Sequence, residues 1–200
     1  MNSGNRKDVV LAGIVMAGML AFSQAGVTEA ADLGDPAAPL QIAEWIKGGP
    51  VDLAAVKGKQ IVVVEFWATW CPPCKASIPH LTKMRKRFKD VVFVGISGEE
   101  SKVVKEFVAR MGGRMDYVVG LDKENKTEEA YMKTFGLQGI PHAFVVDKEG
   151  KIVWHGHPMG GLDKAIEGLI AGTYDIAKER KKIEGQELIE EFVKAVTGGK

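Results

Sequence analysis

The feature that most constrains the fold is the run IVVVEFW at residues 61–67. Its residues are β-branched or aromatic, and nearly every position is apolar rather than every second one. A strand with this pattern is covered on both faces, which is typical of the centre of a sheet that has helices on both sides. Its one charged residue, Glu65, is expected to be buried in that sheet; the alternative is a position at a strand edge facing solvent.

The remaining hydrophobic patterns predict the other elements. Further strands are expected at 91–96, 117–119, 143–146 and 152–154, and helices at 42–47, 75–88, 101–111, 126–135, 162–170 and 175–196. Ser101 is expected to cap its helix, and the last helix is expected to break near Gly185. Crossover helices make the first strands parallel, whereas the turn at 147–150 makes the last pair antiparallel. The expected fold is α/β, with three layers: a mixed central sheet, helices on both faces, and a C-terminal helical extension.

The N-terminus has the parts of an export signal. Arg6 and Lys7 precede an apolar stretch at 9–22, and the small residues of Ser23-Gln24-Ala25 follow it. Thr28-Glu29-Ala30 offers a second cleavage site. This pattern predicts a secretory signal peptide, and an uncleaved membrane anchor is the alternative. Either way, the rest of the chain is expected outside the cytoplasm, in the periplasm or the extracytoplasmic cell envelope.

The 200 residues are enough for one domain with terminal additions. The predicted divisions are a signal peptide or membrane anchor at 1–25, a linker and short helix at 26–49, the main domain at 50–171 and the helical extension at 172–200. A formal net charge of +1 gives no reason to expect nucleic acid as a partner.

The only two cysteines, Cys71 and Cys74, stand where the first buried strand gives way to a helix. Backbone N–H groups at a helix N-terminus stabilise a thiolate and lower the pKa of a cysteine placed there. Cys71 is therefore expected to be an exposed, partly ionised nucleophile. Cys74, one helical turn further on, is expected to be more buried and to act as the resolving thiol.

Two other uses of the cysteines fit less well. A purely structural disulfide stabilises mainly by closing a long loop, and a ring this small closes almost none. A closed zinc site needs four donors, so histidines would have to join the two thiolates. The chain's four histidines, which have no paired metal-ligand spacing, are His80, His142, His155 and His157. No metal and no other cofactor is expected.

The segment Val-Glu-Phe-Trp-Ala-Thr-Trp-Cys-Pro-Pro-Cys-Lys resembles the active-site segment of the thioredoxin superfamily. More narrowly, residues 50–171 resemble the exported TlpA/ResA-like thiol–disulfide oxidoreductases, and the segment 97–133 resembles the helix-and-strand insertion of that branch. The resemblance implies a thioredoxin-like fold. It also implies that Pro79 kinks the active-site helix.

The resemblance implies roles for the site residues. Cys71 and Cys74 match the catalytic redox pair, which forms a disulfide, and Glu65 matches a buried acid that passes protons to the inner sulfur. Ile140-Pro141 matches a loop whose proline is cis and faces the cysteines. The expected substrate-binding residues are Trp70, Pro72, Pro73, Ile140 and Pro141.

The other residues near the motif are expected to be less specific. Trp67 is expected in the core, while Trp70 is expected to be exposed beside the cysteines. His142 is expected to be a satisfied loop histidine, with tuning of the thiolate as the alternative. Lys75 either adds positive potential or is simply solvated. His155 and His157 are expected to face solvent, and His80 to lie on the helix surface.

The function expected is reduction of protein disulfides through a mixed-disulfide intermediate, as in cytochrome c maturation or redox homeostasis of the cell envelope. The partners expected are disulfide-bearing protein substrates and a membrane-embedded electron donor. A disulfide oxidase or isomerase is the alternative. A thiol peroxidase is a further one, for which Thr69 is present but no suitable arginine is found nearby.

Overall fold

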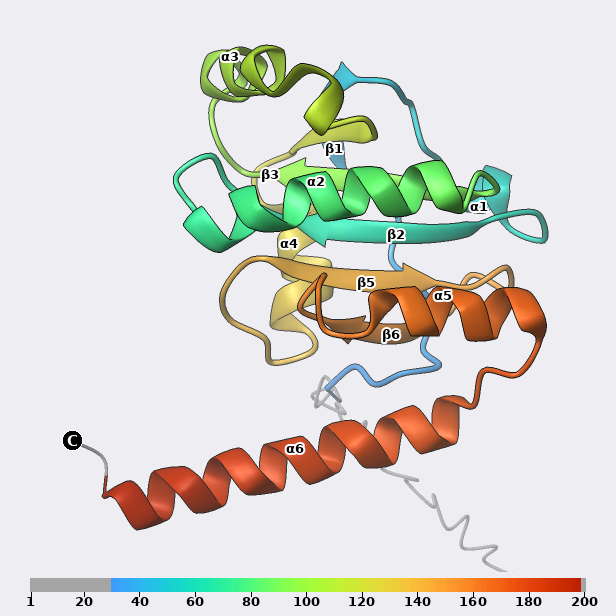
Figure 1. The fold of residues 1–200 in the computed structure, drawn as a ribbon, viewed down its shortest axis with the longest axis vertical. Coiled ribbons are helices and arrows are strands. Elements are labelled where there is room, and N and C mark those ends of the chain that lie inside the picture. Colours follow the sequence, from blue (N-terminus) through green and yellow to red (C-terminus); the bar gives the residue numbers. More distant parts are fainter. Residues whose placement is uncertain (1–29, 199–200) are drawn as a thin grey trace, which may run out of the picture.

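The structure is a computed structural model that describes residues 30–198 (Figure 1). The predicted signal peptide or anchor at 1–25 lies outside the described residues. The strands are β1 (Ile42–Lys47), β2 (Ile61–Phe66), β3 (Val91–Ser97), β4 (Val118–Asp122), β5 (His142–Val146) and β6 (Ile152–Gly156). The helical elements are α1 (Leu53–Val56), α2 (Pro72–Arg87), α3 (Ser101–Met111), the 3-10 turn η1 (Gly112–Arg114), α4 (Lys126–Glu128), the π-helical η2 (Glu129–Lys133), α5 (Leu162–Ala171) and α6 (Ile176–Thr197).

The six strands form one mixed sheet in the order β1-β4-β3-β2-β5-β6. The pairs β2–β3 and β3–β4 are parallel, and the other three pairs are antiparallel. This arrangement confirms the expected α/β fold, with parallel strands first and an antiparallel hairpin last. All six residues of β2 are buried, which confirms a central strand that is covered on both faces.

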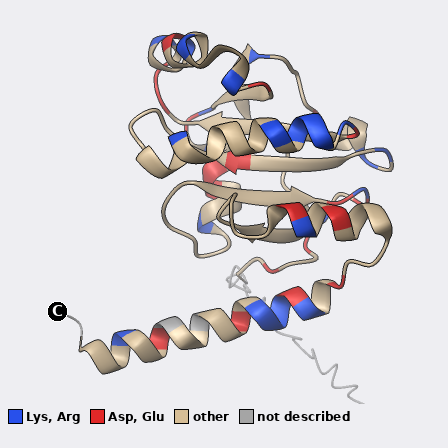
Figure 2. Ribbon diagram, viewed as in Figure 1, with Lys and Arg blue, Asp and Glu red and all other residues tan. Residues whose placement is uncertain are grey.

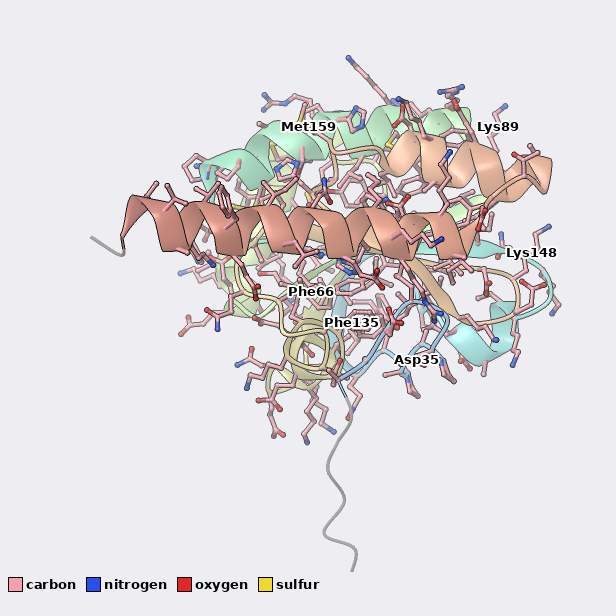
Figure 3. All side chains as sticks on the ribbon, turned by 90° about the horizontal axis from the view of Figure 1, so that it is seen from below. Asp35, Phe66, Lys89, Phe135, Lys148 and Met159 are labelled. Carbon is pink, nitrogen blue, oxygen red and sulfur yellow. A yellow bond between two sulfur atoms is a disulfide. The ribbon has the colours of Figure 1, made fainter. Side chains whose placement is uncertain are left out.

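The two faces of the sheet hold separate cores. Helices α2, α3 and α5 cover one face, where Ile61, Val63 and Trp67 point. Helix α4, η2 and the N-terminal stretch cover the other face, which holds Val62, Val64 and Phe66. Phe66 and Phe135, labelled in Figure 3, both belong to this second core. Because side chains alternate along a strand, Glu65 faces the first core, on the side of α2.

The expected helix at 42–47 is wrong, because this segment is strand β1, antiparallel to β4. The spacing of Ile42, Trp45 and Ile46 suits one face of a helix. The segment instead pairs with β4, and the pairing contains two register shifts, one between Ile42 and Glu44 and one between Trp45 and Lys47. Gly120 of β4 provides the space: a Cβ there would lie 3.1 Å from Ile42 Cγ2 and 3.2 Å from the Trp45 ring. A long-range packing contact therefore outweighs the local periodicity.

The expected break in the last helix is also wrong, since α6 runs without interruption through Gly185. A single glycine costs only about 1 kcal/mol relative to alanine inside a helix. The surrounding glutamates, lysines and arginines are good helix formers that offset this cost. Another correction concerns Ser101, which is the first residue of α3 rather than its cap. Its hydroxyl donates to Glu44 Oε2 at 2.6 Å.

The stretch at 33–37, called here the N-terminal strap, pairs with the start of β6 at the free edge of the sheet. Gly34 N–H donates to the Ile152 carbonyl at 2.6 Å, and Ile152 N–H donates to the Asp35 carbonyl at 2.9 Å. Arg180 of α6 binds the strap as well, because its guanidinium donates to the Leu33 carbonyl. The outer strand of the sheet is therefore paired at its first residue, Ile152.

The C-terminal half of α6 projects past the sheet (Figures 1 and 3). The large apolar side chains that it exposes are Leu188, Ile189, Phe192, Val193 and Val196. Within residues 30–198, none of the helices combines the length and the apolar character that crossing a bilayer requires.

Gly95 of β3 allows two aromatic rings to meet above the sheet. A Cβ at this position would lie 2.9 Å from Tyr117 Cε2 and 3.0 Å from Trp67 Nε1. Both rings are buried, and Trp67 also packs against Phe107 in a tilted pair with ring centroids 5.3 Å apart. Gly95 is the direct partner of Glu65 in the β2–β3 register, so these rings lie close to the buried acid.

We expect Gly95→Ala to destabilise the protein by about 1–3 kcal/mol, because the new methyl group overpacks two ring contacts in the core. Urea unfolding would measure the change in free energy. Gly185→Ala is the matched control. A Cβ at Gly185 meets nothing within 4 Å, so this variant should be neutral or slightly more stable. Equal unfolding midpoints for the two variants would contradict the packing argument.

Candidate active site

The two cysteines form a disulfide at the N-terminus of α2. Cys71 is the N-cap residue, Pro72 and Pro73 open the helix, and the Cys74 N–H donates to Cys71 Sγ at 3.2 Å. Proline suits the first helical turn, where its missing N–H would have had no partner. The sulfur of Cys71 thus receives one of the free N–H groups of the helix start, as the sequence predicts.

The expected exposure of Cys71 is wrong, because the residue is only 2% exposed in this disulfide form. The carbonyl oxygen of Ile140 lies 3.7 Å from its sulfur and covers it from one side. Cys74 is fully buried, in line with its expected inner position. The prolines between them, Pro72 and Pro73, are exposed and form the outer surface of the site.

The loop that faces the disulfide contains the Ile140–Pro141 bond, which is cis as the sequence resemblance implies. Pro141 is buried, and Ile140 is partly buried beside the sulfur of Cys71. Since proline has no N–H, it leaves the approach to the sulfur free of a competing donor.

Trp70 stands beside the disulfide and is 68% exposed, which confirms its expected position at the surface. Trp67, by contrast, is buried in the core as expected. Trp70 lines a groove of about 400 Å³ that also includes Gly139 and Ile140 of the facing loop and Glu99 after β3. A hollow with the exposed Trp70 on its rim therefore lies next to Ile140, the residue that faces the disulfide.

Glu99 fixes the loop that leads to the cysteines. Its carboxylate accepts from the Thr69 N–H at 2.6 Å and from the Thr69 hydroxyl at 2.7 Å. Ser97 adds a third hydrogen bond to the same carboxylate at 3.2 Å. The sequence gives no signal for this contact, because thirty residues separate the two partners and only the fold brings them together.

Glu65 is buried on the α2 side of β2, 1% exposed, and this confirms the interior position rather than the solvent-facing alternative. The Ser77 hydroxyl lies 3.4 Å from its Oε1, and the Tyr117 hydroxyl lies 3.4 Å from its Oε2. Burial raises the pKa of Glu65 to about 8, although the two hydrogen bonds oppose that shift. The carboxyl can therefore gain or lose a proton near neutral pH.

Sequence reasoning missed Ser77 and Tyr117. Ser77 had a usable signal, since a residue three positions after Cys74 lies on the same face of a helix. Tyr117 had none, because its approach to Glu65 depends on the β2–β3–β4 arrangement.

The histidines lie to one side of the cysteines. His142 Nε2 is 3.1 Å from His155 Nδ1, so the ring is satisfied as expected, although the residue begins strand β5 rather than lying in a loop. Burial, followed by the influence of His155 and His157, lowers the pKa of His142 to about 4. The expectation that His155 faces solvent is wrong, because its ring packs in an aromatic cluster with Phe135. His157 is exposed as expected.

Two further residues near the cysteines, Lys75 and His80, differ in their exposure to solvent. Lys75 is exposed, and His80 is half-buried rather than fully on the helix surface. Figure 2 shows Lys and Arg gathered on the C-terminal half of α2, away from the disulfide end. Within the part of the chain that the structure describes, no group of three or more His, Cys, Asp or Glu residues is placed to hold a metal ion.

The fold is thioredoxin-like. The thiol:disulfide interchange protein of Chlorobium tepidum TLS, a thioredoxin family protein, superposes with a TM-score of 0.56 at 28% sequence identity. The match covers 70% of this chain and 99% of that chain. The AhpC/TSA family model matches residues 33–155, and the chain belongs to that family.

Among curated proteins, the chain is similar to the thiol-disulfide oxidoreductase ResA of Bacillus thuringiensis (strain Al Hakam), with 31% identity over 119 residues. That match covers 58% of this chain and 65% of the relative. ResA of Bacillus subtilis (strain 168) is 34% identical over 119 residues, which is 58% of this chain and 63% of that protein. The chain thus spans slightly less than two thirds of the length of these relatives.

We expect the stability of the disulfide form to fall as pH rises from about 4.5 to about 8, because of Glu65. Its pKa is higher in the folded protein, so above pH 4.5 the unfolded chain releases the proton first. The stabilising contribution is complete below that pH and is lost by about pH 8. Glu65→Gln cannot titrate. Relative to wild type, it should therefore gain roughly 1.4 kcal/mol of stability for each pH unit in this window.

Urea unfolding between pH 5 and pH 8 would measure this difference. Glu106→Gln makes the same chemical change at an exposed position on α3 and should keep the wild-type slope. A Glu65→Gln slope equal to that of the wild type would show that the carboxyl does not titrate in this range.

Proposed function

We propose that the protein is an exported thiol–disulfide oxidoreductase that reduces protein disulfides through Cys71 and Cys74. The observation that carries the proposal is the disulfide at the N-terminus of α2, where the Cys74 N–H reaches Cys71 Sγ and the cis-proline loop faces the same sulfur. The names of the ResA relatives and of the Chlorobium tepidum protein support the same chemistry.

The first step uses the reduced protein. The Cys71 thiolate attacks one sulfur of a substrate disulfide, a mixed disulfide forms, and the other substrate sulfur leaves as a thiolate that takes a proton. The N–H groups at the start of α2 stabilise the negative charge on Cys71 before the attack. The 2% exposure of Cys71 in the disulfide form implies that the Ile140 side of the site has to move for a protein sulfur to reach it.

The second step releases the product. Cys74 gives its proton to the Glu65 carboxylate and attacks Cys71 Sγ, so the Cys71–Cys74 disulfide forms and the second substrate sulfur leaves. A base with a pKa of about 8 suits this proton transfer near neutral pH. Two electrons have then passed from the protein to the substrate, and the site is in the disulfide form.

The cycle needs a dithiol that reduces the Cys71–Cys74 disulfide by the reverse exchange. We assign this role to a membrane-embedded electron donor, since an exported protein lies outside the reducing cytoplasm. Maturation of cytochrome c, or more general redox homeostasis of the cell envelope, is the setting in which such a reductase would act.

The substrate-binding surface proposed is the rim of the groove beside the disulfide. Trp70 offers an exposed apolar face on the groove, and Pro72 and Pro73 add exposed surface beside the disulfide. The backbone beside Ile140 and Pro141 is proposed to pair with an extended substrate segment. Pairing of main-chain groups with such a segment gives affinity with little dependence on its sequence.

The thiol peroxidase alternative finds no support in the surroundings of Thr69. Its hydroxyl donates to the Glu99 carboxylate at 2.7 Å. None of the residues that line the groove beside the disulfide is an arginine.

Trapping tests the proposal. In Cys74→Ala, Cys71 can attack a substrate disulfide, but no second thiol can release the product. We expect stable mixed disulfides with envelope proteins, visible on non-reducing gels and identified by mass spectrometry. Cys71→Ala is the matched control and should trap nothing.

The direction of electron flow needs a separate measurement. A reduction potential in the range of thioredoxin-like reductants, roughly −270 mV, would support a reductase. A value near that of the strong oxidant class, roughly −120 mV, would instead favour the disulfide oxidase or isomerase alternative.

The trapping experiment can also contradict the proposal. A Cys74→Ala protein that traps no partner in its native envelope would overturn the substrate assignment.

A further inference from the structure

Two buried hydroxyl groups hold the Glu65 carboxyl from opposite sides. Ser77 Oγ lies 3.4 Å from Oε1, and Tyr117 Oη lies 3.4 Å from Oε2. All three residues are at most 5% exposed, so water does not compete freely for these groups. Each of the two carboxyl oxygens of Glu65 thus has one hydroxyl group within hydrogen-bonding distance.

The fold, not the local sequence, brings the two hydroxyls to the acid. Ser77 follows Cys74 by three residues on α2, and it comes from the helix that carries the disulfide. Tyr117 directly precedes β4, on the far side of β3 from Glu65. Its ring can reach across β3 because Gly95, the register partner of Glu65, has no side chain in the way.

The hydrogen atoms available define one complete network. Ser77 has a single hydroxyl hydrogen, and its shorter contact is with the Cys74 carbonyl at 2.9 Å. If Ser77 donates there, a protonated Glu65 can donate to Ser77 Oγ through Oε1 while Tyr117 donates to Oε2. Every polar hydrogen in the chain Tyr117–Glu65–Ser77–Cys74 then has an acceptor.

Ionisation of Glu65 changes that network. The carboxylate has no hydrogen to give, so the Ser77 hydroxyl must choose between Oε1 and the Cys74 carbonyl, while Tyr117 still donates to Oε2. The protonation state of Glu65 therefore affects whether the Ser77 hydroxyl donates to the Cys74 carbonyl.

We propose that Ser77 and Tyr117 are positioning residues that hold the Glu65 carboxyl in place to exchange a proton with Cys74 during release of the mixed disulfide. The inference rests on the proposed function. In this step, Cys74–SH and Glu65–COO⁻ become Cys74–S⁻ and Glu65–COOH, the new thiolate forms a bond to Cys71 Sγ, and the substrate sulfur leaves with the electron pair of the broken disulfide. Ser77 then accepts from the newly protonated acid.

Among the neighbours of Glu65, Tyr117 has the largest effect on the pKa of the acid. Burial raises the pKa of Glu65, and the hydrogen bonds from Tyr117 and then Ser77 lower it. Within residues 30–198, no Lys, Arg or other acid adds to this shift. In turn, burial followed by Glu65 raises the pKa of Tyr117 well above its usual value, so the phenol stays a donor throughout the working range. Removing this donor removes a preference for the ionised acid.

We expect Tyr117→Phe to raise the pKa of Glu65 by roughly one pH unit, because a hydrogen bond to a charged group is lost. Two measurements on the full chain check this. Carboxyl ¹³C NMR of the disulfide form follows the titration of Glu65 directly. Stopped-flow kinetics follow release of a preformed Cys71 mixed disulfide with a small thiol across pH 6–10, and the midpoint of the rate profile should rise by the same amount. Ser77→Ala should slow the release at pH 7, because the newly protonated acid loses the hydroxyl that accepts from it.

Tyr131→Phe is the matched control. Tyr131 is a fully buried tyrosine on the opposite face of the sheet, and its hydroxyl donates to the Ala38 carbonyl at 2.7 Å. The variant loses a buried hydroxyl of the same kind, so it should lose stability and leave both midpoints unchanged. For Ser77, Thr82→Val removes another buried hydroxyl of α2, which bonds the Arg114 carbonyl instead.

The outcomes separate the two claims. A wild-type protein that cannot release a mixed disulfide through Cys74 overturns the proposed function. If release proceeds and Tyr117→Phe leaves the NMR and kinetic midpoints where they were, or if Tyr131→Phe moves them equally, the positioning role is overturned while the proposed function stands.

Discussion

The covering of β2 on both faces is the constraint on which the rest of the structure depends. A strand that is buried on two sides requires helices above and below it, and the crossover connection through α2 makes β3 parallel to it. Helix α2 then starts where β2 ends, so the disulfide sits at a helix N-terminus. The same burial encloses Glu65 in the core, where desolvation raises the pKa of its carboxyl to about 8. The burial of β2 thus accounts for both the position of the disulfide and the raised pKa of Glu65.

Much of the fold could be predicted because local patterns and long-range packing agree. The buried strands, the helix after the cysteines and the final hairpin all follow from apolar runs and turn residues. The prediction failed where a distant contact decided the structure. Ile42 and Trp45 have helical spacing, yet they pair as a strand because Gly120 leaves room for them. Gly185 signals a break on its own, but the long helix around it tolerates the local cost.

The candidate site divides in the same way. Cys71, Cys74, Glu65 and the cis bond before Pro141 could be predicted because they belong to short motifs or to a clear burial pattern. Glu99, Ser77 and Tyr117 could not, since their roles arise only where separate elements meet. The covered sulfur of Cys71 was missed for a related reason: its exposure is set by Ile140, sixty-nine residues away.

The N-terminal strap gives the start of the folded region a defined limit. Its bonds to β6 begin at Gly34, and Arg180 binds the chain at Leu33. Proteolytic maturation after Ala25 or after Ala30 would leave every one of these contacts in place. A cut only a few residues further on would leave the backbone N–H and carbonyl of Ile152 in β6 without these partners. Cleavage anywhere upstream of Leu33 would therefore leave this pairing in place, whereas cleavage beyond Leu33 would begin to remove it.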